Sequence, residues 1–189
     1  MTASEHGTVD LSQFPEGDLD RGASRFKEAL WLLVRSLLFL YFPFGFYAVK
    51  RFVLVAFGAK IGKRVVVKPG AKIVFPWKLQ VDDHAWIGED CMIINLAPVH
   101  IGRSACVSQR AVLCTGSHDY SKTTFDLITR DIVLQDGSWI AASAWVGPGV
   151  TVGSHAILTA GSVTSKDLEP YGIYQGNPAV KVRERAIQS

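Results

Sequence analysis

The stretch Leu134–Leu158, LQDGSWIAASAWVGPGVTVGSHAIL, places an aliphatic residue at every sixth position. These positions are Leu134, Ile140, Val146, Val152 and Leu158. An α-helix repeats its apolar face about every 3.6 residues and a single strand about every 2, so a period of six fits neither element. It fits a coil of short strands in which each flat face takes one hexapeptide and the aliphatic side chain points into a narrow interior.

The same period covers most of the remaining chain. One series of aliphatic residues runs in steps of six from Ile61 to Leu79. After a slip of two residues a second series begins at Val81, and a third begins at Ile101. Glycine, alanine or serine beside the aliphatic positions suits crowded corners between the faces. The largest interruption, residues 119–131 (DYSKTTFDLITRD), is polar and should leave the coil as a loop. We therefore predict an all-β fold with a parallel β-helix of hexapeptide repeats over residues 59–170.

The composition excludes several classes of protein. The 189 residues are 48% hydrophobic and 20% charged, which suits one ordinary domain and argues against disorder. The net charge of +3 is not concentrated in a dense basic run, so we expect no nucleic-acid partner. The three cysteines form no C-x-x-C pair, which signals neither a zinc site nor a disulfide framework. A reducing, cytoplasmic setting is expected.

The chain before the repeats divides into two segments. Residues 1–24 form a polar N-terminal arm without the features of a secretory signal, and we expect it to be loosely held. Residues 25–58 form an apolar helical segment whose centre, 29–49, reads ALWLLVRSLLFLYFPFGFYAV. Arg35 is its only charge, Pro43 interrupts it, and basic residues flank both ends, so we expect two helices or one broken helix.

Three interpretations of the segment 29–49 stay open. Its apolar side chains could cover the following domain or a neighbouring subunit, through Trp31, Leu32, Leu37, Leu38 and Phe42. It could instead lie in a membrane interface, with its basic flanks on anionic headgroups, as a peripheral contact. A true transmembrane span is the third interpretation, which Arg35 and Pro43 disfavour.

Four segments carry a resemblance to a known family. They are FGAKIG at 57–62, FPWKL at 75–79, LCTGSHDY at 113–120 and YQGNPAVKVRER at 174–185. The chain from about Ala59 to Ile187 resembles the left-handed parallel β-helix acyltransferases built from hexapeptide repeats. Within that family it is most similar to the sugar O-acetyltransferases of exopolysaccharide synthesis, of the colanic-acid biosynthesis type. Residues 171–189 would then form a short C-terminal tail.

The resemblance implies a catalytic role for His118. Transfer of an acyl group from a thioester to a sugar hydroxyl needs a base, and histidine suits that task near neutral pH. Asp119, or a backbone carbonyl, would hold the second ring nitrogen of His118. The other histidines do not form the cluster of imidazoles that a zinc site needs, so no metal is expected.

The resemblance also implies an acetyl-CoA groove, an acceptor pocket and a homotrimer with sites between subunits. Ala142 and Ala160 would lie along the pantetheine arm, Ser165 and Lys166 near the nucleotide, and Arg183 at a phosphate, whose oxygens a guanidinium can bond in pairs. Asn95 would contact the acceptor. Exposed Trp86, Trp139 and Trp145 would gain from the cover of a neighbouring subunit.

These observations favour an O-acetyltransferase that moves acetyl from acetyl-CoA to a sugar or lipid-linked saccharide in exopolysaccharide biosynthesis. Two alternatives stay open. A non-catalytic β-solenoid scaffold would retain the repeat without His118 and the basic tail, and an N-acetyltransferase would acylate an amino sugar or a small xenobiotic. A fold alone does not decide between them.

Overall fold

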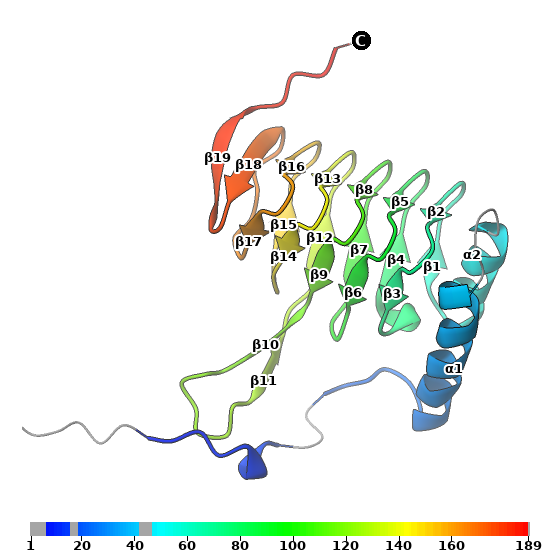
Figure 1. The fold of residues 1–189 in the computed structure, drawn as a ribbon, viewed down its shortest axis with the longest axis vertical. Coiled ribbons are helices and arrows are strands. Elements are labelled where there is room, and N and C mark those ends of the chain that lie inside the picture. Colours follow the sequence, from blue (N-terminus) through cyan, green and yellow to red (C-terminus); the bar gives the residue numbers. More distant parts are fainter. Residues whose placement is uncertain (1–6, 16–18, 42–46, 189) are drawn as a thin grey trace, which may run out of the picture.

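A computed structural model describes residues 7–15, 19–41 and 47–188, and most of them form a parallel β-helix of about six turns (Figure 1). Three sheets make its faces. Face A contains β1(Lys60–Ile61), β4(Leu79–Val81), β7(Val99–Ile101), β12(Ile132–Leu134) and β15(Thr151–Val152). Face B contains β2(Val66–Val67), β5(Trp86–Ile87), β8(Cys106–Val107), β13(Trp139–Ile140), β16(Ile157–Leu158), β18(Gly172–Gly176) and β19(Ala179–Glu184). Face C contains β3(Lys72–Ile73), β6(Met92–Ile94), β9(Val112–Cys114), β14(Trp145–Val146) and β17(Val163–Thr164).

The predicted period of six is confirmed by the core. The aliphatic residues of the series fill the interior, and Leu134, Ile140, Val146, Val152 and Leu158 are completely buried. Each chain segment passes from face A to face B to face C, and neighbouring turns pair in parallel, so each turn is stabilised by the next.

The corners explain the small residues beside the aliphatic positions. A Cβ atom on Gly88 would lie 2.6 Å from the backbone nitrogen of Gln109 in the next turn, so only glycine fits there. Two residues further along the hexad, the backbone takes a positive φ, for example 63° at His84 and 54° at Asp90. This left-handed residue turns the chain from one face to the next.

Two helices cover the N-terminal end of the coil (Figure 1). They are α1(Arg25–Tyr41) and α2(Tyr47–Ala56), and the predicted interruption at Pro43 lies outside the described residues. Trp31 is completely buried and its Nε1 donates to the carbonyl oxygen of Ile73 at 3.0 Å. Among the described residues, none of the helices combines the length and the hydrophobicity that crossing a bilayer requires.

The inner face of α1 is narrower than the sequence predicts. Of the residues expected to cover the domain, Trp31 does so, but Leu32 and Leu37 are exposed. The side chains of Leu38 and Phe42 lie outside the described part. A straight helix can turn only one stripe toward the flat end of a coil, so Leu32 and Leu37 do not cover this domain, and their cover by a neighbouring subunit stays a prediction.

The interruption at residues 119–131 is ordered around an antiparallel hairpin. β10(Gly116–His118) pairs with β11(Leu127–Thr129), and the hairpin projects from the corner between face C and face A (Figure 1). Residues of the N-terminal arm lie against it, because the backbone N–H of Asp10 donates to the carbonyl of Thr123 at 2.9 Å. The arm includes a short 3₁₀ helix, η1(Leu11–Gln13). A second 3₁₀ helix, η2(Pro76–Lys78), belongs to the coil and lies directly before β4. The described part of the arm therefore lies against the hairpin, and the expectation that the arm is loosely held stays a prediction.

The C-terminal tail continues face B. β18 pairs in parallel with β16, and β19 folds back antiparallel on β18. Arg185 fastens this hairpin to the coil, since its Nη1 donates to the carbonyls of Gly137 and His155 at 3.0 and 3.1 Å.

Candidate active site

His118 ends β10 at the base of the projecting hairpin. Its Nδ1 lies 2.9 Å from the carbonyl oxygen of Phe125. A carbonyl oxygen can only accept a hydrogen bond, so Nδ1 carries the proton and the neutral ring keeps a free lone pair on Nε2. Among the described residues, Nε2 has no hydrogen-bond partner. The ring is therefore oriented as a proton acceptor.

The hairpin holds both the carbonyl and the ring of Phe125 against His118. The two rings stack with centroids 4.3 Å apart and an interplanar angle of 8°. Phe125 has a φ of 52°, and its backbone N–H donates to the carbonyl of Lys122. Asp126 fixes this turn by accepting from Lys122 Nζ and Thr124 Oγ1, each at 2.5 Å, and these bonds lower the pKa of its carboxyl.

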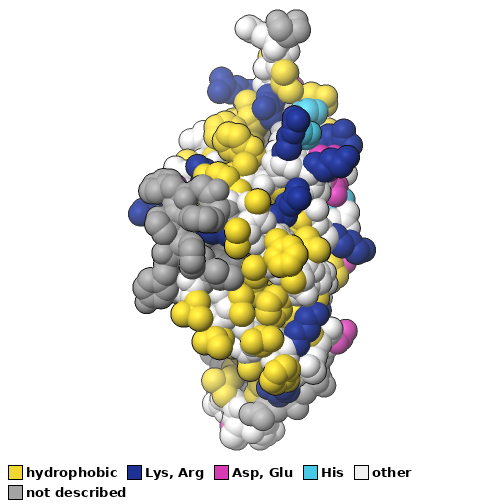
Figure 2. Space-filling model, turned by 90° about the vertical axis from the view of Figure 1, so that its right-hand side faces the viewer, with side chains coloured by type: hydrophobic (Ala, Val, Ile, Leu, Met, Phe, Trp, Pro, Cys, Tyr) yellow, Lys and Arg dark blue, Asp and Glu magenta, His cyan; other side chains and the backbone are white. Residues whose placement is uncertain are grey.

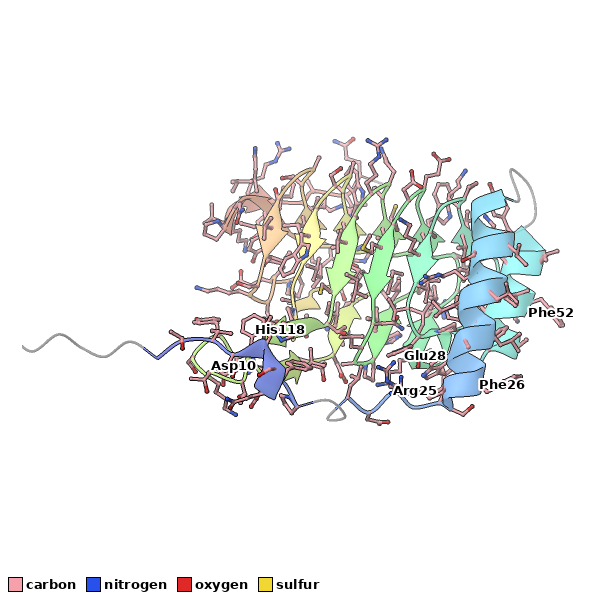
Figure 3. All side chains as sticks on the ribbon, turned by 60° about the horizontal axis from the view of Figure 1, so that its bottom comes forward. Asp10, Arg25, Phe26, Glu28, Phe52 and His118 are labelled. Atoms are coloured by element: carbon pink, nitrogen blue, oxygen red, sulfur yellow. The ribbon has the colours of Figure 1, made fainter. Side chains whose placement is uncertain are left out.

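The N-terminal arm supplies a second aromatic neighbour. The ring of Phe14 lies 5.9 Å from that of His118, tilted by 59°. Asp10 and His118 lie close together in space although they are far apart in the chain (Figure 3). The Asp10 carboxylate caps η1 by accepting from Ser12 and Gln13, so it shapes the arm beside the histidine.

Asp119 does not support His118 in the way that the sequence suggests. Its carboxylate accepts from the backbone N–H and the hydroxyl of Ser121, at 3.1 and 2.5 Å, and these bonds lower its pKa. It therefore caps its own turn. Of the two predicted ways to hold the second ring nitrogen, the structure shows the backbone carbonyl, that of Phe125.

Asn95 lies in the interior of the coil. It is completely buried, its Oδ1 accepts from the backbone N–H of Phe75 at 2.9 Å, and its Nδ2 donates to the carbonyl of the same residue at 2.5 Å. The amide thus completes the backbone pairing of a turn whose register slips. This position gives Asn95 a structural role, and its contact with an acceptor stays a prediction.

The residues predicted for the pantetheine groove lie on another edge of the prism from His118. Ala142 and Ala160 occupy successive turns of the corner between faces B and C, where the N–H of Gly161 donates to the carbonyl of Ala142 at 2.9 Å. His118 belongs to the corner between faces C and A. One chain therefore does not bring the histidine and the predicted groove together.

The cations near the C-terminus fall into two groups. Lys181 forms ion pairs with Glu169 and Glu184 at 2.7 and 2.6 Å, which raise its pKa, and Arg185 is bound to the coil. Arg183 and Lys166 are exposed, and their side chains show no partner within the described chain. Ser165 is exposed beside Lys166. Arg183 and Lys166 are thus available to an anionic ligand.

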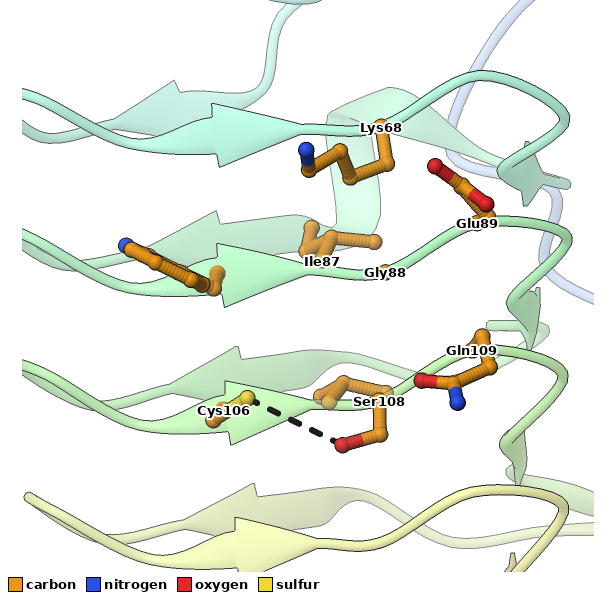
Figure 4. Close-up of a pocket in the computed structure, with 9 residues that line it drawn as sticks. Lys68, Ile87, Gly88, Glu89, Cys106, Ser108 and Gln109 are labelled. Carbon is orange, nitrogen blue, oxygen red and sulfur yellow. Dashed lines mark hydrogen bonds between the residues drawn. The ribbon is translucent and has the colours of Figure 1, made fainter.

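Face B carries a groove of about 470 Å³ that contains none of the predicted site residues (Figure 4). Its lining includes Lys68, Trp86, Glu89, Cys106 and Gln109. Trp86 is 55% exposed and pairs in register with Cys106, which pairs in turn with Trp139. Face B therefore presents an exposed apolar row.

The remaining histidines lie apart from His118. His100 Nε2 is 2.7 Å from Asp82 Oδ2, the ring of His155 lies tilted against that of Tyr171, and His84 is exposed at a corner. No group of three or more His, Cys, Asp or Glu side chains that could hold a metal ion occurs in residues 7–15, 19–41 and 47–188.

Comparisons with known proteins agree with this fold. No family model matches the chain. The colanic acid biosynthesis acetyltransferase WcaF of Escherichia coli is 40% identical over 176 residues, which cover 93% of this chain and 97% of WcaF.

Two solved structures have the same fold. A hexapeptide-repeat acetyltransferase of Vibrio cholerae, in complex with acetyl-CoA, has a TM-score of 0.74 at 23% identity, covering 86% of this chain and 87% of its own. A galactoside acetyltransferase in complex with coenzyme A has a TM-score of 0.76 at 18% identity, and the match covers 84% of this chain and 80% of the galactoside acetyltransferase. At these identities the likeness concerns the fold. The 40% identity to WcaF extends over nearly the whole of both chains, and it shows more than a shared fold. The protein belongs to the colanic acid biosynthesis acetyltransferase family of hexapeptide-repeat enzymes.

Proposed function

We propose that this acetyltransferase moves the acetyl group of acetyl-CoA to a sugar hydroxyl during exopolysaccharide biosynthesis, with His118 as general base. The observation that carries the proposal is the hydrogen bond from Nδ1 of His118 to the Phe125 carbonyl, which leaves Nε2 free to accept a proton. The name of the WcaF relative supports a saccharide acceptor, and the solved relatives in complex with acetyl-CoA or coenzyme A support the donor.

The reaction follows from this tautomer. Nε2 of His118 removes the proton of the acceptor hydroxyl while its oxygen attacks the thioester carbonyl carbon. The tetrahedral intermediate collapses, the carbon–sulfur bond breaks, and the departing sulfur of coenzyme A takes the proton back from Nε2. The Phe125 carbonyl stabilises the transient imidazolium because its hydrogen bond from Nδ1 strengthens when the ring is charged.

The residues present suit coenzyme A. Ala142 and Ala160 leave a corner without large side chains, along which a pantetheine arm can approach the backbone. Arg183 and Lys166 supply exposed cations for its phosphates, with Ser165 beside them. No step of the chemistry needs a metal ion.

A homotrimer would complete the site. Because His118 and the corner of Ala142 and Ala160 lie on different edges of one prism, a neighbouring copy must bring them together. The exposed row of Trp86, Cys106 and Trp139 on face B is a surface that such a copy would cover.

Titration calorimetry with acetyl-CoA tests the donor site. We expect saturable binding that weakens by about 10- to 150-fold in Arg183→Ala, because a charge-assisted hydrogen bond contributes roughly 1.5–3 kcal/mol. Arg103→Ala, an exposed arginine on a turn of the coil, is the matched control and should bind normally. A folded protein that does not bind acetyl-CoA would instead support a scaffold.

An acceptor panel tests the second half of the proposal. Matched hydroxyl and amino sugars are offered with acetyl-CoA, and the acetylated product is identified by mass spectrometry. Transfer to the hydroxyl sugars is expected. Transfer to the amino sugars alone would assign the protein to the N-acetyltransferases.

A further inference from the structure

The two N-terminal helices turn an apolar stripe away from the protein. On α1 it consists of Phe26, Leu30, Leu33 and Leu37, whose spacing of four, three and four residues places them on one side of the helix. Trp31 lies on the other side, against the coil. Phe26 is 78% exposed and Leu33 58%, so the stripe has no cover within the described chain.

The second helix has the same arrangement. Leu54 is completely buried against the coil, whereas Phe52 is 73% exposed and Val49 and Val55 about half exposed. Phe26 and Phe52 both point away from the β-helix (Figure 3). Exposed apolar residues scattered singly are ordinary, but a continuous surface of this kind marks a binding site.

Basic residues predominate among the charged residues of the two helices and of the first turn of the coil. Between residues 25 and 72 the sequence contains a single acidic residue, Glu28, and that carboxylate is paired with Arg21 at 2.5 Å. The same range contains ten basic residues, of which Lys50 is buried and Arg35 is bonded to the coil; the other eight are Arg25, Lys27, Arg51, Lys60, Lys63, Arg64, Lys68 and Lys72. Figure 2 shows this end of the molecule, where hydrophobic side chains gather and Lys and Arg side chains lie beside them.

Arg35, the one charged residue of the segment 29–49, does not interrupt the apolar stripe of α1. Arg35 is turned toward the coil, where its Nη1 donates to the carbonyl of Ile73 at 3.3 Å. Burial lowers the pKa of Arg35. The outer face of α1 is therefore apolar, with Arg25 at its start and Arg51 on the neighbouring helix exposed to solvent.

We propose that the outer face of α1 and α2 docks on a membrane surface rich in anionic lipid. The apolar stripe would enter the boundary between headgroups and acyl chains, and the basic residues would contact the anionic headgroups. A second copy of the same surface is a poor occupant, because it would bring two sets of positive charges together.

The docking is peripheral. With about 1.5 Å per residue, the 17 residues of α1 measure about 26 Å, less than the hydrocarbon core of roughly 30 Å. The inner faces of both helices are also held against the coil through Trp31 and Leu54. Docking would keep the enzyme at a membrane whether its acceptor is soluble or lipid-linked, so this proposal does not depend on the acceptor.

Flotation of the full-length protein with lipid vesicles tests the proposal. Vesicles of phosphatidylcholine alone are compared with vesicles that also contain phosphatidylglycerol. We expect the protein to float with the second kind and to be released by high salt, because salt screens the headgroup contacts. Phe26→Ser/Phe52→Ser should reduce the partition coefficient at least about tenfold, since two exposed aromatic side chains would no longer enter the lipid.

Matched variants separate this surface from general effects. Val180→Ser/Val182→Ser changes two exposed apolar residues of β19 and should float like the native protein. Arg25→Gln/Arg51→Gln should float less, while Arg103→Gln/Arg110→Gln, on the turns of the coil, should not. Acetyl transfer to a soluble acceptor should be unchanged in Phe26→Ser/Phe52→Ser, which shows that the variant is folded.

Any of three results would overturn the proposal. The first is native protein that stays at the bottom of the gradient with anionic vesicles. The second is a Phe26→Ser/Phe52→Ser variant that floats as the native protein does. The third is a concentration-dependent increase in mass by light scattering that anionic vesicles do not reverse and that the same variant abolishes. That outcome would assign the surface to contacts between copies of the chain.

Discussion

Replacing Phe125 by alanine removes the ring that stacks on His118 but keeps the carbonyl that accepts from its Nδ1. Both residues are L-amino acids and are equally unsuited to the φ of 52° at this position, so the backbone strain changes little. A stacked pair of this kind contributes roughly 0.5–1.5 kcal/mol beyond its buried area, which corresponds to a roughly two- to twelvefold change in rate. We therefore expect kcat to fall by about that factor.

The assay is the release of coenzyme A, measured by chromatography under saturating acetyl-CoA. The KM for acetyl-CoA should not change, because the ring of Phe125 stacks on His118 and is not among the residues predicted to bind acetyl-CoA. Tyr120→Ala, which removes an 85% exposed ring from the same hairpin, is the matched control and should have normal activity. An unchanged kcat in Phe125→Ala would refute the idea that stacking orients His118, as would a loss as large as that of removing the histidine.

Three further predictions concern the coil. Asn95→Ala leaves the backbone N–H of Phe75 unpaired in the interior, although the Phe75 carbonyl still accepts from the N–H of Lys78, so the free energy of unfolding in urea should fall by about 1–3 kcal/mol; normal stability with a raised acceptor KM would place Asn95 in the acceptor pocket instead. Burial raises the pKa of the Cys91 thiol to about 12, so it stays protonated near neutral pH. Peptide mapping should show that iodoacetamide labels it only after unfolding, and rapid labelling of the folded protein would contradict this. Gly88→Ala should lower the Tm more than Gly161→Ala, because the Cβ at 88 would meet backbone at 2.6 Å, whereas Gly161 has open space around it and only its φ of 67° disfavours alanine; a loss at Gly88 no larger than at Gly161 would mean that corner crowding is not the reason for glycine.

The coil was predictable because one simple rule decides every turn. An aliphatic side chain at each sixth residue must be buried, and residues such as Ile87 and Leu158 are completely buried. The interruption at 119–131 was also visible as a loss of period. Its hairpin form was not, because the pairing of His118 with Leu127 depends on the geometry of the turn between them.

The partners of His118 depend on contacts that a linear pattern does not contain. The carbonyl of Phe125 points at the ring because of a positive φ, which is uncommon for phenylalanine, so Asp119 was the more obvious choice from the sequence. Phe14 lies more than a hundred residues before His118 and reaches it only because the arm follows the hairpin. Asp126, which fixes the turn, could have been suspected from its place after Phe125, four residues from Lys122.

The outward stripe of α1 could not be identified from the sequence, although its residues are regularly spaced there. Its spacing is present in the sequence, but the segment is apolar on nearly every side, so periodicity could not tell the inner face from the outer one. The structure distinguishes them through the contacts of Trp31 and Arg35 with Ile73.

The rate of acetyl transfer by His118→Ala, under conditions in which calorimetry shows normal binding of acetyl-CoA, tests the central claim most directly. A general base contributes about 10²- to 10⁴-fold to such reactions, so kcat should fall by that amount while donor affinity is retained. A variant that binds acetyl-CoA and transfers acetyl at the native rate would show that the Nε2 of His118 is not the proton acceptor.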